Sequence, residues 1–197
     1  MKLSAYRLPA SFIVCFVFIL TVHADTVQTV VDNAKSQCGV TLSYDPAYYR
    51  ISYPGGDLPI EKGVCTDVII RALRSVGVDL QQLIHEDMKR HFAEYPRKWG
   101  HKKPDTNIDH RRVPNIRKYL ERTGRRLPVS RNGKEYLPGD LVTWELPGGL
   151  DHIGIVIDVK VEGTDRYGIV HNIGYGTQME DILFSYPITG HYRFFKK

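Results

Sequence analysis

The sequence predicts an α+β protein in which helices from the first half of the chain pack on an antiparallel β-sheet from the second half. Two patterns support this. The first half carries apolar residues at spacings of three and four, and the second half carries short β-branched runs separated by turn residues. The chain has 197 residues, of which 42% are hydrophobic and 25% charged. That composition fits one globular domain and excludes both a disordered tail and a polytopic membrane protein.

Residues 1–24 are expected to be a secretory signal that does not belong to the fold. Lys2 and Arg7 give a positive start, residues 12–22 form a short apolar stretch, and small or branched residues stand where a signal peptidase reads the chain. The alternative is an uncleaved anchor, although the stretch is short for a membrane span. We therefore expect a single periplasmic or secreted domain, residues 25–197, that contacts a membrane only transiently through this signal.

Four helices are expected before the strands. The clearest covers residues 65–76, where Asp67 lies in the first turn and Arg71 and Arg74 lie late, as the helix dipole favours. The other three are expected over residues 26–37, 80–92 and 114–123. Residues 41–57 are rich in Tyr, Pro and Gly and are expected to form an ordered loop whose tyrosines either line a cleft or simply pack.

The second half is expected to supply the strands. Residues 139–144 alternate after a Pro-Gly turn, and residues 152–158 and 167–171 are β-branched runs with polar residues between them. Residues 182–186 and 190–195 are expected to add edge strands. The sheet is therefore expected to be antiparallel.

Cys65 is the first candidate for chemistry because it stands at the predicted start of the helix over residues 65–76. The positive end of a helix dipole and its free backbone N–H groups lower the pKa of a thiol and can stabilise an oxyanion. A buried, unreactive cysteine is the alternative. Asp67, two residues further on, either opposes ionisation of the thiol or supports the helix N-terminus.

His152 and His171 are expected to lie together. One begins a predicted strand and the other ends the next, so a hairpin register that pairs 152 with 171 places both side chains on one face. A nucleophile, a base and an orienting group are the parts of an activated thiol, and Asn172 is the alternative orienting group. A zinc site built from Cys65, His152, His171 and His110 would use the same side chains. No metal-binding spacing accompanies them, so we expect no cofactor.

These motifs resemble the NlpC/P60 peptidases. In that family a Cys opens a helix, a Pro-Gly-Asp sequence leads a strand, a His-hydrophobic-Gly sequence lies on the next strand, and a third polar residue follows. The matching segments here are residues 63–69, 137–144, 151–156 and 169–172. The chain also closely resembles an uncharacterised bacterial domain-of-unknown-function family, DUF1287, through residues 63–74, 107–115 and 142–154, and that resemblance covers nearly all of the chain after the signal.

The resemblance implies a papain-like, NlpC/P60-type core and a cysteine peptidase or amidase that attacks an amide bond. Carried over by position, Cys65 would be the nucleophile, His152 the base and His171 the orienting residue. NlpC/P60 enzymes typically cut peptide bonds of bacterial peptidoglycan, so peptidoglycan or its peptide fragments would be the partner. The chain departs from the family in having Val64 before the cysteine and Thr66 and Asp67 after it.

Four residues are expected to bind substrate: Tyr53, Asp109, His110 and Arg111. Arg111 could pair with a substrate carboxylate. The net charge of +5 and a basic stretch over residues 97–126 suggest a solvated or polyanion-contacting face; no nucleic-acid motif accompanies them, and no nucleic-acid partner is expected. We expect a monomer. The alternative function is a non-catalytic envelope-binding domain with a structural Cys38–Cys65 disulfide.

Overall fold

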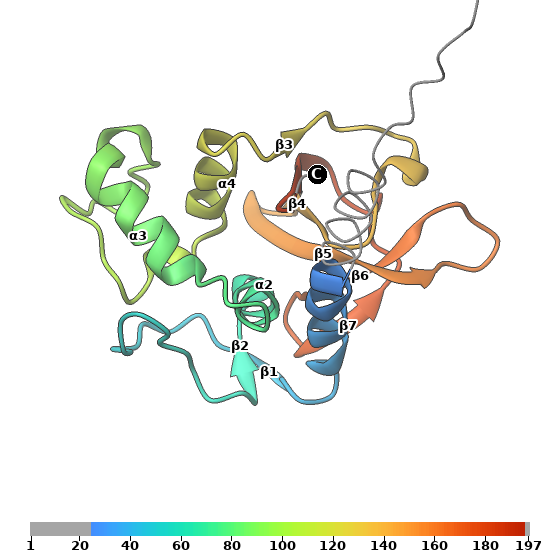
Figure 1. The fold of residues 1–197 in the computed structure, drawn as a ribbon, viewed down its shortest axis with the longest axis horizontal. Helices are drawn as coiled ribbons and strands as arrows, with labels where there is room; N and C mark the ends of the chain where they lie inside the picture. Colours follow the sequence, from blue (N-terminus) through green and yellow to red (C-terminus); the bar gives the residue numbers. More distant parts are fainter. Residues whose placement is uncertain (1–24, 196–197) are drawn as a thin grey trace, which may run out of the picture.

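The structure is a computed structural model that describes residues 25–195, so the expected signal over residues 1–24 lies outside the described part. It is an α+β protein, as the sequence predicts. Helices α2, α3 and α4 gather on one side of a strongly curved antiparallel sheet (Figure 1).

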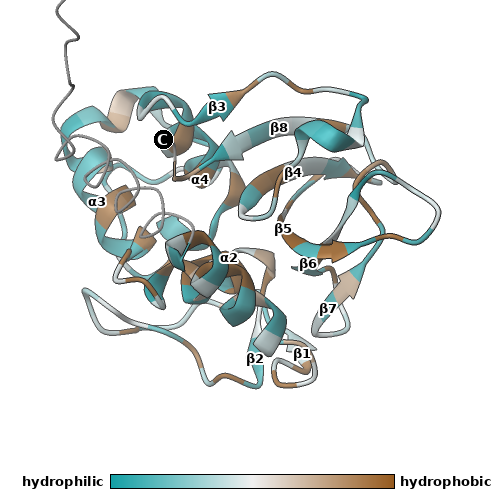
Figure 2. Ribbon diagram, turned by 45° about the vertical axis from the view of Figure 1, so that its right-hand side comes forward, coloured by the Kyte–Doolittle hydropathy of each residue, from teal (hydrophilic) through white to brown (hydrophobic). Residues whose placement is uncertain are grey.

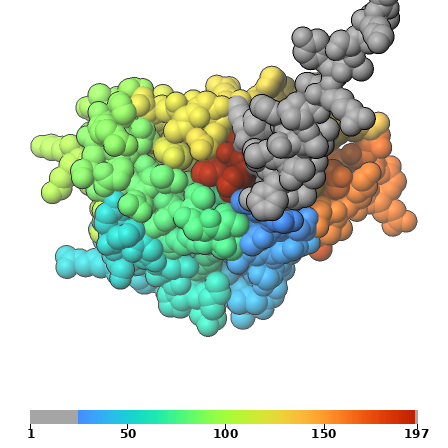
Figure 3. All heavy atoms as spheres, viewed as in Figure 1, coloured from blue at the N-terminus to red at the C-terminus, as the bar shows by residue number. Residues whose placement is uncertain are grey.

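The predicted helices are confirmed to within two residues at each end. Residues 25–36 are helical, and α2 (Cys65–Arg74), α3 (Leu80–His91) and α4 (Val113–Arg122) follow. Short 3₁₀ turns form at Phe92–Glu94, Asp109–Arg111 and Gly133–Glu135. The segment over residues 25–36 lies beside the sheet, where Lys35 and Gln28 each contact the carboxylate of Asp158 at 2.8 Å (Figure 3).

Six strands form the sheet in the order β3-β8-β4-β5-β6-β7, and every neighbouring pair is antiparallel. Their bounds are β3 Arg126–Leu127, β4 Asp140–Leu146, β5 Leu150–Lys160, β6 Tyr167–Asn172, β7 Thr177–Glu180 and β8 Ile188–Arg193. A separate two-stranded parallel sheet joins β1 (Ser43–Tyr44) to β2 (Lys62–Gly63) at the ends of the expected loop.

Two strand predictions are wrong. Residues 182–186 form no strand; they cross the outer face of the sheet, where Leu183 is fully buried and its carbonyl accepts a 3.0 Å hydrogen bond from the indole of Trp144. The segment over residues 190–195 is not at an edge, since β8 pairs with both β3 and β4. The edge strands are β3 and β7, and neither was predicted. The strand β3 has only two residues, and in β7 three of the four residues are exposed and show no apolar alternation.

The two faces of the sheet are covered by different cores. On the inner face, Ile153, Ile155 and Val170 pack against apolar residues of α2, α3 and α4, including Ile69 and Ile116. Figure 2 shows this hydrophobic colour on α2 and along β4 and β5. On the outer face, a smaller cluster is formed by Tyr136, Val142, Trp144, Val156, Ile169 and Leu183. Alternate residues of β5 therefore face different surroundings.

The predicted register of the β5–β6 hairpin is wrong by two residues. Ile155 pairs with Val170 and Val156 with Ile169, which continues to place His171 opposite Gly154 and not opposite His152. A Cβ on Gly154 would lie 3.2 Å from the Cβ of His171, so glycine leaves room for the histidine there. The two histidines still share a face, because a shift of two residues preserves the alternation of side chains.

Candidate functional site

Cys65 is the first residue of α2, and the residues around it fix the start of the helix. Val64 is extended, so the chain turns abruptly into the helix. The Asp67 carboxylate accepts a 2.7 Å hydrogen bond from the backbone N–H of Val64, which satisfies one of the amides left free at a helix start. Gly63 fits this corner, since a Cβ on it would lie 3.0 Å from Asp67. Of the two roles considered for Asp67, support of the helix N-terminus is therefore confirmed.

Asp67 also forms a buried ion pair with Arg111. The Arg111 Nε and Nη2 each lie 3.0 Å from a carboxylate oxygen of Asp67, and the two side chains are 2% and 3% exposed. The guanidinium further donates to the carbonyls of Ala47 and Asp45, both at 2.9 Å. Arg111 thus ties the helix start to the preceding loop. Although it borders the cleft described below, its donors are largely committed and not free for a substrate carboxylate.

The thiol of Cys65 has the opposite pKa shift from the one predicted. Burial raises the pKa to about 12, and the nearby charge of Asp67 adds to the rise. Backbone amides of Ile153, Thr66 and Cys65 itself act in the lowering direction but are outweighed. Desolvation dominates because the side chain is only 3% exposed and belongs to the inner core. The group is therefore a neutral thiol at pH 7.

His152 of β5 and His171 of β6 are in direct contact, and a third residue, Glu180, extends them into a chain of hydrogen-bonded side chains, called here the histidine chain. His152 Nε2 lies 3.0 Å from His171 Nδ1, with the rings edge to face at 82°. His171 Nε2 lies 2.8 Å from Glu180 Oε2 on β7. The two histidines are 2% and 1% exposed, whereas the Glu180 side chain is 44% exposed. A line of hydrogen-bonding groups therefore runs from the interior to the edge of the sheet.

Burial keeps both rings neutral. It lowers the pKa of His152 to about 3, and the adjacent His171 contributes to the lowering. Burial also lowers the pKa of His171, although the hydrogen bond and charge of Glu180 act in the opposite direction. Each neutral ring carries one N–H and one bare nitrogen, so the hydrogen bonds decide which nitrogen is which.

The thiol lies beside the start of β5, the strand that carries His152. The Cys65 sulfur lies against the backbone amide of Ile153, the residue that follows His152. Within residues 25–195, no hydrogen bond joins the sulfur to the imidazole of His152, which lies on the outer face with its ring centroid 5.8 Å from that of Trp144. Hydrogen bonds between catalytic groups are often long before substrate binds.

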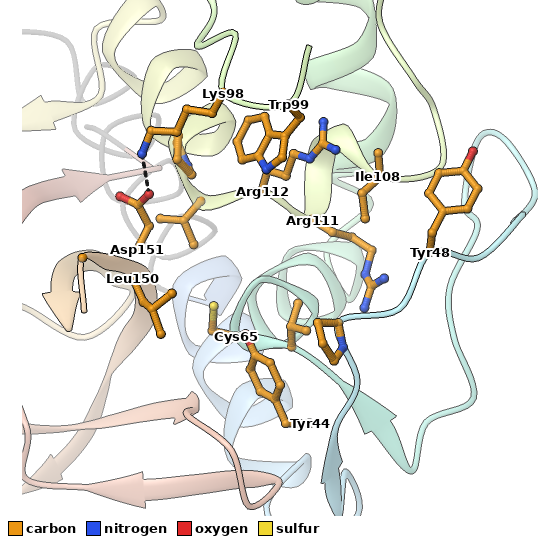
Figure 4. Close-up of a pocket in the computed structure, with 15 residues that line it drawn as sticks. Tyr44, Tyr48, Cys65, Lys98, Trp99, Ile108, Arg111, Arg112, Leu150 and Asp151 are labelled. Carbon is orange, nitrogen blue, oxygen red and sulfur yellow. Dashed lines mark hydrogen bonds and ion pairs between the residues drawn. The ribbon is translucent and has the colours of Figure 1, made fainter. Parts of the chain in front are cut away.

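A cleft of about 560 Å³ opens above Cys65. The sulfur of Cys65 points into the cleft (Figure 4). The walls come from β1 and the loop that follows it, from the segment before α4, and from the β4–β5 turn. Most of its walls are aromatic or apolar, from Tyr44, Pro46, Tyr48, Trp99, Ile108, Val113, Pro114 and Leu150. Such a surface suits an extended ligand with apolar parts.

Charged residues stand at the rim of this cleft. Lys98 reaches across it to Asp151, with Nζ 3.0 Å from the carboxylate (Figure 4). Asp151 immediately precedes His152, so this pair lies close to the histidine chain. The guanidinium of Arg112 stacks on Trp99, 4.0 Å from the ring centroid. The cleft thus offers both signs of charge beside its aromatic walls.

The other predicted substrate residues do not line this cleft. The Asp109 carboxylate accepts from the backbone N–H of Asp105 at 2.6 Å and pairs with Arg112, so it holds the 3₁₀ turn together. His110 is 3% exposed, and burial lowers its pKa to about 3. Tyr53 lies against α3, where its hydroxyl donates to Glu86 at 3.0 Å. Substrate contact by these three residues stays a prediction that the geometry does not support.

Asn172, the alternative orienting residue, has a different position. Its amide donates to the carbonyl of Gly63 at 3.0 Å, which joins the end of β6 to the strand before Cys65. It makes no hydrogen bond to His152, whereas His171 does. Asn172 therefore holds the segment before Cys65 against the sheet, and His171 is the residue that hydrogen-bonds to His152.

Sequence reasoning missed Glu180 and the Lys98–Asp151 pair. Glu180 gives no local signal, since it is one of several polar residues in an unpredicted edge strand. Asp151 could have been noticed as the carboxylate next to His152. Its partner Lys98, however, is 53 residues away in the chain.

Cys38 and Cys65 are both free, so the disulfide considered in the alternative function is not formed. In the described part of the chain, no three His, Cys, Asp or Glu side chains are grouped in a way that could hold a metal ion. The zinc arrangement considered from the sequence is therefore not assembled there. No helix among residues 25–195 is long and apolar enough to cross a membrane.

Fold and site together define an α+β protein with a curved antiparallel sheet, in which a cleft is lined by a thiol at a helix start and the neighbouring strand β5 carries one of two buried histidines in contact. The chain belongs to the family described as "Domain of unknown function (DUF1287)", whose pattern it matches over residues 31–194. It is also similar to the uncharacterized protein YijF of Escherichia coli strain K12, with 52% identity over 180 residues that cover 91% of this chain and 87% of that protein. The resemblance to DUF1287 expected from the sequence is thereby confirmed.

Proposed function

We propose that this protein is an exported cysteine hydrolase that cleaves a peptide or amide bond, with Cys65 as nucleophile, His152 as base and His171 as orienting residue. The observation that carries the proposal is the position of Cys65, which starts α2, lines an open cleft and lies against the backbone amide of Ile153, the residue that follows His152. A papain-like, NlpC/P60-type core is part of the proposal and rests on the order of the sequence motifs.

The proposed reaction begins from a neutral thiol and a neutral imidazole. His152 takes the thiol proton as the sulfur attacks the amide carbonyl, and backbone N–H groups at the start of α2 hold the oxyanion. His152 then gives that proton to the leaving amine, and a thioester remains on Cys65. Water hydrolyses the thioester, which releases a carboxylic acid and restores the thiol. The raised pKa of Cys65 requires that proton transfer accompany attack, because little thiolate is present beforehand.

Bacterial peptidoglycan, or peptides derived from it, is the proposed substrate. Support comes from the predicted export signal, the resemblance of the motifs to NlpC/P60 peptidases, and a cleft that combines aromatic walls with Lys98 and Asp151. A peptide that carries both amino and carboxyl groups complements such a cleft.

The test is digestion of purified peptidoglycan and its soluble peptides, with the products identified by mass spectrometry. The wild-type protein is expected to release new amino and carboxyl termini, and Cys65→Ala is expected to release none. Cys38→Ala is the matched control, since Cys38 is a free cysteine outside the cleft lining, and this variant is expected to keep full activity. Cleavage that survives Cys65→Ala would overturn the proposal.

A second candidate function is a non-catalytic domain that binds envelope peptides. The burial that raises the pKa of Cys65 favours it, because structural cysteines are buried and unreactive. It predicts that wild-type and Cys65→Ser proteins bind peptidoglycan peptides with equal affinity and that neither cleaves them. Calorimetric titration alongside the digestion distinguishes the two functions.

A further inference from the structure

Glu180 closes the chain that begins at His152. Its carboxylate lies 2.8 Å from His171 Nε2, and it is the outermost member of the chain, on the edge strand β7. A carboxylate can only accept a hydrogen bond, whereas a neutral imidazole has one nitrogen that donates and one that accepts. The carboxylate therefore constrains which ring nitrogen carries the proton, first in His171 and then in His152.

Two proton arrangements of the neutral pair form the hydrogen bond between the rings. In the first, His152 Nε2–H donates to His171 Nδ1, and His171 Nε2–H donates to Glu180. In the second, His171 Nδ1–H donates to His152 Nε2, so that the bare Nε2 of His171 faces the carboxylate. Only the first satisfies both contacts, because the second sets a lone pair against an anion inside a buried region.

The same choice fixes the reactive nitrogen of His152. In the first arrangement its proton is on Nε2 and its Nδ1 is bare, so Nδ1 can take a proton. In the second, Nδ1 is already protonated and the ring cannot act as a base through it. We propose that Glu180 is a positioning residue that sets the tautomer of His171 and, through it, leaves Nδ1 of His152 free to accept the Cys65 proton. The proton transfer from Cys65 and its kinetic consequence rest on the proposed function, whereas the assignment of the tautomers does not.

Glu180 acts in this scheme without taking a proton. When His152 Nδ1 accepts the thiol proton, its Nε2–H continues to donate to His171, and the His171 Nε2–H continues to donate to the carboxylate. The S–H bond breaks, the N–H bond forms, and the two outer hydrogen bonds strengthen as positive charge develops on His152. The imidazolium is thus stabilised by groups that do not need to reorganise.

The position of Glu180 makes the inference testable without unfolding the protein. Its side chain is 44% exposed, so replacing it removes little packing. Glu180→Ala removes the acceptor, and Glu180→Gln keeps an acceptor oxygen without the charge. Glu162→Ala is the control, because Glu162 is an exposed glutamate in the turn between β5 and β6, at the end of the hairpin away from both histidines.

The deciding measurement is nitrogen NMR of protein labelled with ¹⁵N-histidine, with signals assigned through His152→Gln. Wild type and Glu162→Ala are expected to show protonated Nε2 and bare Nδ1 on both rings. Glu180→Ala is expected to show a mixture of tautomers, and Glu180→Gln to lie between. A wild-type His152 with protonated Nδ1, or an unchanged spectrum in Glu180→Ala, would overturn the inference.

The kinetic arm uses the hydrolysis assay of the proposed function. Glu180→Ala is expected to lower kcat about tenfold with little change in KM, and Glu180→Gln to restore part of the loss. An unchanged kcat in Glu180→Ala would show that the tautomer is set in another way. If the wild-type protein cleaves nothing, the proposed function fails, and the NMR comparison still decides whether Glu180 sets the tautomers.

Discussion

The outer face of the sheet carries two buried histidine clusters that differ in how they end. In the first, His152 contacts His171, which contacts the half-exposed Glu180. In the second, His191 lies 2.8 Å from the carboxylate of Asp140 by Nε2 and 3.2 Å from a backbone carbonyl by Nδ1, and Arg193 pairs with the same Asp140 at 2.7 Å.

This difference indicates which of the two clusters is suited to accept and release a proton. Both nitrogens of His191 face acceptors and Asp140 is 1% exposed, so every polar group has a fixed partner and no nitrogen is left over. In the first cluster, the hydrogen bonds use only one nitrogen of His152. The two clusters contain similar residue types. Both ring nitrogens of His191 have partners within the protein, whereas one ring nitrogen of His152 remains available to a reacting group.

The largest expected effect is on catalysis, from His152→Ala. Loss of the base is expected to lower kcat by about 10³-fold, within the range for general-base residues. His191→Gln is the matched change in the other cluster and is expected to leave kcat within about threefold per folded molecule. Assays at equal concentrations of folded protein check this, and an equal loss in both variants would erase the distinction between the clusters.

The next largest effect is on stability, from Asp140→Asn. It leaves the charge of Arg193 without its buried partner, so we expect a loss of about 3 kcal/mol in the free energy of unfolding. Glu180→Gln, in the half-exposed position, is expected to cost less than about 1 kcal/mol. Urea unfolding of both variants measures the difference. Comparable losses would mean that the His152–His171–Glu180 cluster contributes as much to folding stability as the His191–Asp140–Arg193 cluster.

Acid is expected to destabilise the protein through its neutral buried histidines. The pKa is lowered to about 3 in both His152 and His110, whereas an unfolded histidine titrates near 6.5. The unfolded state therefore binds more protons between these values, and stability is lost as pH falls from about 6.5 toward 3. Each such histidine contributes about 1.4 kcal/mol per pH unit.

This acid sensitivity can be assigned to single residues. His110→Gln and His152→Gln are each expected to flatten the dependence of the unfolding free energy on pH over that range, whatever they do to stability at pH 8. Urea unfolding at several pH values measures the slope. A slope that both variants leave unchanged would show that these rings are charged in the folded protein.

The smallest expected effect comes from the Lys98–Asp151 pair across the cleft. Its side chains are 59% and 24% exposed, so Lys98→Met is expected to change stability by less than about 0.5 kcal/mol. Loss of the contact is expected to open the rim and to raise the alkylation rate of Cys65 about twofold, and about 0.5 M salt is expected to have the same effect on the wild type. A slower rate in Lys98→Met would show that the pair does not restrict access.

The helices, the central strands and the candidate thiol and histidines were predictable from the amino-acid sequence alone. Apolar spacing reports which face a helix buries, and a β-branched run reports a central strand, so α2 and β5 could be recognised locally. The shared face of His152 and His171 was also predictable, because it depends only on the alternation of side chains along a strand.

The strand register, the edge strands and the pKa shifts of the buried groups depend on contacts between distant parts of the chain and were not predictable locally. Register depends on contacts such as that of Gly154 with His171, and β7 forms because β6 offers an edge, not because its own residues favour a strand. Helix position alone predicted a lowered pKa for Cys65. Burial reversed that shift, because desolvation depends on everything packed around the thiol and that packing comes from residues far away in the chain.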